Sequence, residues 1–252
     1  MSDPNQEFQP PPPFTPKPEP PAVEMSTPAT LTGIFFEPGR VFDALRARPR
    51  FLIAGLVLLI LTIGVTATVY KRIDMDQYIR DKMEKSPRAA SQTPEQKEMG
   101  VKIGKMFGFA IPVFVPIGIA VGAALYLLGV MAFGGSIGYK KAVTVWVYSS
   151  LPPGVLGSIV AVLVLFLKAP DQIDPEHLLI TNPGAFMGPD SSPVLVAVLS
   201  QFDLLRFYGL FLAAIGLRKL ANLSSGSAWG VVLGFYLIRA LLAICSAAIF
   251  GG

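Results

Sequence analysis

Three charged residues, Asp203, Arg206 and Arg239, lie inside long apolar stretches of the sequence. Charges are costly in hydrocarbon, and those found there are usually paired or belong to a pathway for ions or substrates. Asp203 and Arg206 are three residues apart, so one face of a helix can carry both. Arg239 lies about 15 Å into its stretch at the rise of a helix, hence near the middle. We therefore expect the Asp203 carboxylate to face the helix bundle within ion-pair distance of an arginine.

Two interpretations of this polar cluster are open. In the first, the three charges form an ion or substrate site, and the Tyr208 and Tyr236 hydroxyls contribute to it. In the second, the charges tie neighbouring helices together, and one arginine extends toward the membrane surface. The second interpretation requires no ligand, and the sequence favours it.

Pro152, Pro153 and Gly154 interrupt another apolar stretch. Proline lacks the backbone N–H and crowds the carbonyl four residues earlier, so two carbonyls in the preceding turn lose their partners. Broken helices of this kind surround substrates in transporters, where they normally occur in matching repeats. This sequence has no convincing internal repeat. It therefore predicts a local kink, in which nearby serine hydroxyls satisfy the freed carbonyls.

The side chains used most often in catalysis and metal binding are scarce. His177 is the only histidine, and Cys245 is the only cysteine. The sequence contains no carboxylate cluster for a metal, no evident nucleophile–base pair and no glycine-rich nucleotide-binding loop. We expect no catalytic residue, no cofactor and no metal. The net charge of +4 comes from connectors, where Lys and Arg contact lipid headgroups, so we expect no nucleic-acid partner.

The composition is that of a membrane protein. Of the 252 residues, 52% are apolar and 15% are charged, and the mean hydropathy is +0.55. A soluble domain carries about 25% charged residues. The apolar residues fall into blocks of about 20, the length with which a helix crosses a bilayer. The sequence therefore predicts an all-α, polytopic transmembrane helical bundle with five spans, near 51–70, 107–133, 145–167, 199–217 and 229–250.

The fourth block is the least regular, because Pro193 precedes it and Asp203 interrupts its apolar run. It is either one tilted helix or an interfacial piece followed by a shorter span that begins near Ser200. The second option is favoured, since it places Asp203 closer to the outer interface, where burial of the carboxylate costs less.

Two segments precede the first span. Proline dominates residues 1–30, so this cytoplasmic tail is predicted to be disordered, and residues 31–252 are predicted to form the membrane domain. Within 38–48, apolar residues share one face of a helix, and arginines accompany them. Such an amphipathic helix is predicted to lie in the headgroup layer and to lead into the first span.

The arginines ahead of the first span indicate a cytoplasmic N-terminus, and five spans then place the C-terminus outside. Basic residues in the connectors 134–142 and 218–228, and acidic residues in 168–193, agree with this orientation. The connector 71–106 disagrees, because it would lie outside although it carries nine Lys or Arg residues against six acidic residues. We expect the N-terminus inside, because most connectors support it.

Small residues recur four apart in the second block, as at Gly118 and Gly122 and at Ala120 and Ala124, and Gly129 follows them. This spacing allows helix backbones to approach closely. We expect tight packing within the bundle, with self-association of two copies as the other option.

The stretch GGSIGYKKAVTVWVYSSLPPGVLG, which contains Gly138 and Tyr139, joins the second and third blocks. It resembles the corresponding stretch of the Yip family (Ypt/Rab-interacting protein family), with a glycine-rich end, an aromatic, basic residues and an aromatic-serine run into proline. LTGIFFEPGRVFDAL resembles the entry segment of that family, and FDLLRFYGLFLAAIGLRKLANLSSGSAW resembles its late stretch. The resemblance covers residues 31–250. The residues that follow Asp203 depart from the family pattern, so the resemblance does not identify Asp203 as a family site.

The resemblance implies five helices, a cytoplasmic N-terminus and a C-terminus on the other side. Eukaryotic relatives are tied to Rab GTPases and vesicle membranes, but the low-complexity tail here gives no reason to expect a GTPase partner. The sequence is more similar to bacterial-type members, so we expect the bacterial cytoplasmic (inner) membrane.

We predict a non-enzymatic multi-pass protein that organises the membrane or binds partner proteins. Its expected partners are the lipid bilayer and another membrane protein or a second copy. The alternative is a small-solute or ion transporter or channel that uses the kinked third span and the cluster of Asp203, Arg206 and Arg239.

Overall fold

The structure is a computed structural model that describes residues 24–84, 92–175, 178–188 and 191–250. The predicted disorder of residues 1–23 concerns a segment outside the described residues. Within the described ranges every regular element is helical, which confirms the predicted all-α class.

Among the described residues, four helices are long and apolar enough to cross a membrane. The shortest has 21 residues and the longest has 39, which meets the requirement of about 20 residues for a bilayer. They are α3 (Leu52–Arg72), α5 (Pro94–Ala132), α6 (Tyr139–Leu167) and α9 (Ser225–Phe250). Each corresponds to one of the predicted apolar blocks.

The region of the fourth predicted block forms two helices, as the favoured option expects. α7 (Pro193–Leu199) and α8 (Leu204–Leu220) are inclined by 45° to each other, and residues 200–203 separate them. Together the two helices are long and apolar enough to cross a membrane, so the described part of the chain has as many as five candidate spans. The predicted division near Ser200 is confirmed, and the longer helix begins at Leu204.

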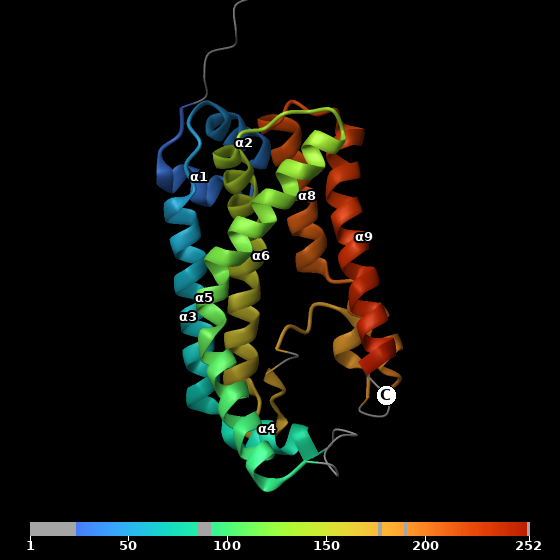
Figure 1. Ribbon diagram of the computed structural model, residues 1–252. Coiled ribbons are helices and arrows are strands. Elements are labelled where there is room, and N and C mark those ends of the chain that lie inside the picture. Colours follow the sequence, from blue (N-terminus) through green and yellow to red (C-terminus); the bar gives the residue numbers. More distant parts are fainter. Residues whose placement is uncertain (1–23, 85–91, 176–177, 189–190, 251–252) are drawn as a thin grey trace, which may run out of the picture.

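The helices are arranged as an elongated bundle (Figure 1). α3, α5 and α6 pack against one another, and α8 packs against both α6 and α9. α1 (Thr27–Gly33) and α2 (Pro38–Ala47) lie at one end, and α4 (Met75–Glu84) lies at the other (Figure 1). The C-terminal end of α9 points away from α1 and α2 (Figure 1). We call residues 24–50 the cap, and we call the end with α4 the distal end.

The apolar face of α2 contacts protein instead of lipid. Val41, Phe42 and Leu45 are fully buried, and α2 packs mainly against α8. Gly216 makes this contact possible, because a Cβ atom there would lie 2.9 Å from the Phe42 ring. The predicted helix is present, its apolar face packs against α8, and its place in the headgroup layer stays a prediction.

Some residues predicted to be disordered belong to the cap. α1 begins at Thr27, and the Ser26 hydroxyl accepts a hydrogen bond from the Ala29 N–H at 3.4 Å. Thr30 is fully buried, and its hydroxyl lies 3.0 Å from the Tyr148 hydroxyl of α6. The predicted limit of the tail at residue 30 is therefore wrong for residues 24–30, which are held by contacts distant in sequence.

α5 begins at Pro94, well before the predicted span at 107. Thr93 and Gln96 form a capping box, in which each side chain bonds the backbone N–H of the other. Further along, the Lys105 ammonium pairs with Asp76 of α4 at 2.9 Å. The connector 71–106 is thus largely helical where it is described, and α4 is tied to the start of α5.

The buried apolar residues form two clusters of unequal size. The larger cluster joins the cap to α5, α6, α8 and α9 and contains the aromatic rings of Phe42, Tyr126 and Tyr148. The smaller cluster lies toward the distal end, where Leu165 of α6 packs with Val69 of α3 and with loop residues. The bundle is therefore packed most extensively next to the cap.

Close helix contacts occur at some of the predicted small residues. A Cβ atom at Gly122 would lie 2.3 Å from the Trp146 ring, and one at Gly129 would lie 2.6 Å from Val231. A Cβ atom at Gly118 would have no neighbour within 4 Å, and Ala124 is exposed. The predicted tight packing is confirmed at Gly122 and Gly129 and is wrong for Gly118.

Candidate functional site

Asp203 occupies the N-cap of α8, directly after the break between α7 and α8. Its Oδ1 atom accepts a hydrogen bond from the backbone N–H of Arg206 at 2.8 Å, and its Oδ2 atom accepts one from the Thr181 hydroxyl at 2.6 Å. The side chain is only 7% exposed. Aspartate is among the preferred residues at this position, because its carboxylate satisfies an amide that the first helical turn leaves free.

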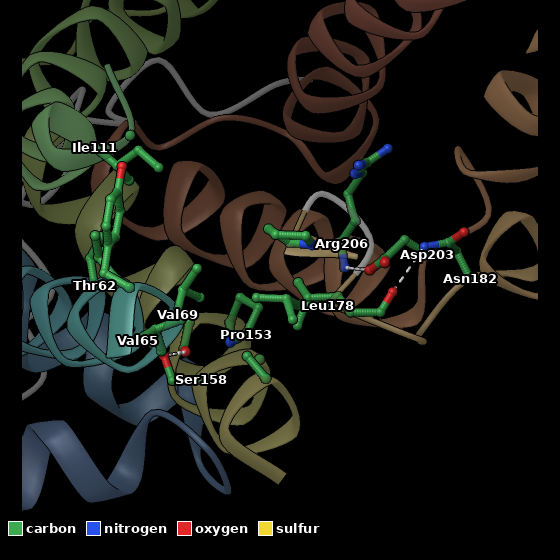
Figure 2. A pocket seen from close by; sticks show the side chains of 18 of the residues that line it. Thr62, Val65, Val69, Ile111, Pro153, Ser158, Leu178, Asn182, Asp203 and Arg206 are labelled. Carbon is green, nitrogen blue, oxygen red and sulfur yellow. Dashed lines mark hydrogen bonds between the residues drawn. The ribbon is translucent and has the colours of Figure 1, made fainter. Parts of the chain in front are cut away.

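The predicted ion pair between Asp203 and an arginine is absent from the described residues. The Arg206 guanidinium instead donates to the Gln201 side-chain oxygen at 3.0 Å and to the Ser200 carbonyl at 3.4 Å. Figure 2 shows the guanidinium pointing away from the Asp203 carboxylate. The prediction is wrong because Asp203 uses its oxygens to cap the helix, although its burial within the bundle is as expected.

Arg239 lies on the side of α9 that faces the bundle. It follows the buried residue Val232 by seven positions, or two helical turns, so the two share one face. Arg239 is close enough to Arg206 to interact with it electrostatically, yet its side chain is exposed. The structure therefore places the two predicted arginines within electrostatic range of each other.

Tyr208 and Tyr236, which were predicted to join the polar cluster, contact different parts of the protein. The Tyr236 hydroxyl donates to the Gln201 carbonyl at 2.9 Å, so it belongs to the break. The Tyr208 hydroxyl donates to the Phe35 carbonyl of the cap at 3.2 Å, so its bond ties α8 to the cap. Gln201 and Thr181 are the polar residues that sequence reasoning missed; the only signal for Gln201 is its position in an apolar stretch.

The proline motif does not break α6. The helix continues from Tyr139 to Leu167 through Pro152 and Pro153. The Ser149 hydroxyl donates to the Trp146 carbonyl at 3.0 Å, and the Ser158 hydroxyl donates to the Gly154 carbonyl at 2.7 Å. The prediction that serine hydroxyls satisfy the carbonyls freed by the prolines is therefore wrong. Gly209 of α8 packs against this part of α6 instead, and a Cβ atom at Gly209 would lie 3.5 Å from the backbone carbonyl oxygen of Ser149.

A cavity of about 680 Å³ connects the proline motif to the break. Pro153 lines one side, and Asp203 and Arg206 line another (Figure 2). Gly154 also belongs to the lining. Its volume falls within the range of about 300–1,000 Å³ that is typical of small-molecule sites. Arg239 is not part of its lining. The remaining walls come mainly from α3 and from the loop before α7, and they include Thr62, Thr66, Val65, Val69, Ser158, Leu178, Leu179 and Asn182.

The motif residues Gly138 and Tyr139 lie at the start of α6, outside the cavity. Gly138 is the N-cap residue of α6. The Tyr139 hydroxyl donates to the Ala120 carbonyl of α5 at 3.1 Å. In this structure the motif begins α6 and ties its first residue to the body of α5.

His177 and Cys245, the side chains considered for metal or thiol chemistry, form no metal site in the described part of the chain. No group of three or more His, Cys, Asp or Glu side chains there is placed to hold a metal ion. Cys245 is a free, exposed thiol near the end of α9. His177 lies outside the described residues.

The fold and the site together define a multi-pass helical membrane protein with a cavity beside the break between α7 and α8. Residues 32–247 match the family model of the Yip1 domain, so the chain belongs to the Yip1 domain family. The chain is also similar to the membrane protein YknW of Bacillus subtilis (strain 168), with 27% identity over 221 residues that cover 84% of this chain and 90% of the relative. No solved structure matches the chain significantly.

Proposed function

We propose that this protein is a non-enzymatic membrane protein that organises partner membrane proteins through its cap, on the cytoplasmic side. Membership of the Yip1 domain family and the similarity to a bacterial membrane protein support a role within the membrane. The observation that carries the proposal is the construction of the cap, which is anchored firmly on its inner side and exposes an aromatic and basic surface.

Long-range contacts hold the inner side of the cap. The Lys219 ammonium of α8 pairs with Asp43 at 2.8 Å, and the Thr30 and Tyr148 hydroxyls meet at 3.0 Å. Arg50 also bonds the Met25 carbonyl, which joins the two ends of the cap. A surface attached in this way is preorganised, and preorganisation lowers the entropy cost of binding a partner.

The outer side of the cap has the composition of an interaction surface. Phe36 is 84% exposed, next to the turn between α1 and α2. Aromatic residues and arginine are enriched at protein–protein interfaces. Exposed basic residues surround this end of the bundle: Arg40, Arg46, Arg48, Lys140 and Arg218.

The distribution of charge supports a cytoplasmic cap. The exposed basic residues of the cap end fit the positive-inside rule. The connector 71–106 is the exception, but part of its positive charge is paired: Lys102 with Glu98 at 3.1 Å and Lys105 with Asp76 at 2.9 Å. Arg40 and Arg48 of the cap are paired in the same way, with Glu37 at 3.1 Å and Glu24 at 3.2 Å, so the connector remains the one exception to the proposed orientation.

A photo-crosslinking amino acid at position 36 tests the proposal. In cells, it is expected to give discrete adducts with one or a few membrane proteins, because the exposed ring would sit within an interface. The matched control is the same amino acid at Leu167, which is 81% exposed at the far end of α6. Equal adducts at both positions, or none at position 36, would contradict the proposal.

Transport of a small solute is a second candidate, and the cavity beside the broken span favours it. Non-helical backbone at membrane depth normally lines a cavity or is buried in protein. Purified protein in proteoliposomes is expected to support solute flux under this hypothesis, and Asp203→Asn or Arg239→Gln is expected to reduce it. Arg218→Gln, which removes an exposed charge from the cap end of α8, is the control. Flux no greater than that of empty vesicles would contradict transport and leave the organising role as the single proposal.

A further inference from the structure

The two arginines at the break carry more positive charge than the described residues around them compensate. Both hydrogen bonds of the Arg206 guanidinium go to uncharged acceptors, the Gln201 side chain and the Ser200 carbonyl. Arg239 makes no ion pair with the described residues, and it lies within electrostatic range of Arg206, another cation. The nearby Asp203 carboxylate accepts hydrogen bonds from the Arg206 backbone N–H, at the N-terminus of α8, and from the Thr181 hydroxyl. One negative charge therefore faces two positive ones.

The Arg206 part of this excess charge lies deep in the bundle. Leu205, in the first turn of α8, contacts the position of Gly157 in α6, and Gly209 contacts Pro153. Positions 153 and 157 lie about 15 Å or more from either end of α6 at the helical rise. Arg206 is thus close to the middle of the membrane span, where water cannot readily screen it.

The cavity next to Arg206 could hold the body of a ligand. Its lining combines aliphatic side chains, such as Val65, Val69 and Leu178, with the hydroxyls of Thr62 and Ser158. The volume of about 680 Å³ suits a drug-sized molecule. A guanidinium group binds a carboxylate or phosphate through two parallel hydrogen bonds, which are stronger than bonds between neutral groups.

We propose that the cavity binds an organic anion, with a carboxylate or phosphate group at Arg206 and a hydrocarbon body between α3 and α6, and that Arg239 adds positive potential from outside the lining. A free organic acid and an anionic lipid share this chemistry. The inference concerns binding, and it depends neither on the partner contacts of the cap nor on transport across the membrane. Failure of the crosslinking test at Phe36 would therefore leave it intact.

Equilibrium binding of radiolabelled octanoate to the full chain in zwitterionic nanodiscs tests the site. Saturable binding is expected, with competition by hexyl phosphate but not by octanol, acetate or inorganic phosphate. Octanol has the hydrocarbon body without the charge, and the two small anions have the charge without the body. Absence of saturable octanoate binding, or equal competition by octanol, would overturn the proposal.

Variants of the two arginines connect the binding to the proposed residues. Arg206→Gln is expected to weaken octanoate binding by about tenfold or more, the effect of losing a hydrogen bond to a charged group. Arg206→Lys should retain part of the affinity, and Arg218→Gln should bind like the unmodified protein. If Arg206→Gln fails to fold in a thermal unfolding assay, Arg239→Gln replaces it, because the exposed Arg239 side chain is dispensable for packing. Unchanged affinity in the folded variant would overturn the assignment.

A third arm separates the two sources of the anion. Nanodiscs with added anionic phospholipid are compared with the zwitterionic ones. Displacement of octanoate by the lipid, lost in the arginine variant, identifies an anionic lipid as an occupant of the site. Unchanged octanoate binding identifies a free organic acid as the ligand class, and either result supports the anion site.

Discussion

The cap end and the distal end of the bundle are built from similar apolar helices but are packed in different ways. At the cap end, Phe42 is fully buried against α8, and the large core cluster continues into α5, α6 and α9. Toward the distal end, the smaller cluster lies beside a cavity of about 680 Å³. One end is therefore suited to hold a fixed surface, and the other has room for a ligand.

The difference arises from how each end satisfies polar groups. The cap joins distant segments through direct bonds, such as that between Lys219 and Asp43. The break between α7 and α8 instead uses Asp203 and Gln201 to satisfy backbone groups and an arginine within a few residues. Thr181 and Tyr236 add bonds from more distant segments, yet a cavity remains open beside the break. Polar residues in a membrane bundle thus serve packing at one end and leave a cavity at the other.

The largest expected effect is the loss of packing in the cap. Phe42→Ala should lower the free energy of unfolding by about 3–5 kcal/mol, because it leaves a cavity between α2 and α8. Thermal and denaturant unfolding in detergent measures the change. Phe186→Ala is the control toward the distal end, since Phe186 is 75% exposed, and it should change stability by less than about 0.5 kcal/mol. Similar losses for both variants would mean that the cap is not the better packed end.

An intermediate effect is expected at the break. Asp203→Ala should cost about 2 kcal/mol, from the lost cap of α8 and the unpaired Thr181 hydroxyl. Asp203→Asn should cost clearly less, because an amide oxygen still caps the helix. The same unfolding measurements compare the two variants. If asparagine were as damaging as alanine, the negative charge itself would be required, and the ion pair expected from the sequence would regain support.

The positions of the spans could be predicted from the sequence because they depend on a local property, the length of an apolar run. The environment of a helix face could not. The apolar face of α2 looks the same in sequence whether it meets lipid or protein, and its partner Gly216 lies far along the chain. The start of α5 at Pro94 could have been found, since Thr93 and Gln96 have the spacing of a capping box.

The candidate site shows the same limit. The burial of Asp203 follows from its apolar surroundings, but its partners depend on where α8 begins, and a break of a few residues decides that. Thr181 gives no signal in the sequence, because it reaches Asp203 only after the loop before α7 has folded back. The proximity of Arg206 and Arg239 was predictable from their similar depths, whereas their lack of a counter-ion in the described residues was not.

The smallest expected effect concerns single hydrogen bonds at the two ends. A double-mutant cycle of Thr30→Val and Tyr148→Phe should give a coupling energy of about 0.5–1.5 kcal/mol, because their hydroxyls meet in a buried contact at 3.0 Å. The matched cycle of Tyr78→Phe and Asp174→Asn probes an exposed bond of 2.9 Å at the distal end. This second coupling should be smaller, because water competes for exposed hydrogen bonds and offers alternative partners when one is removed. A distal coupling equal to that of the cap would show that the two ends are held with comparable strength, and the preorganised surface proposed for the cap would then lose its physical basis.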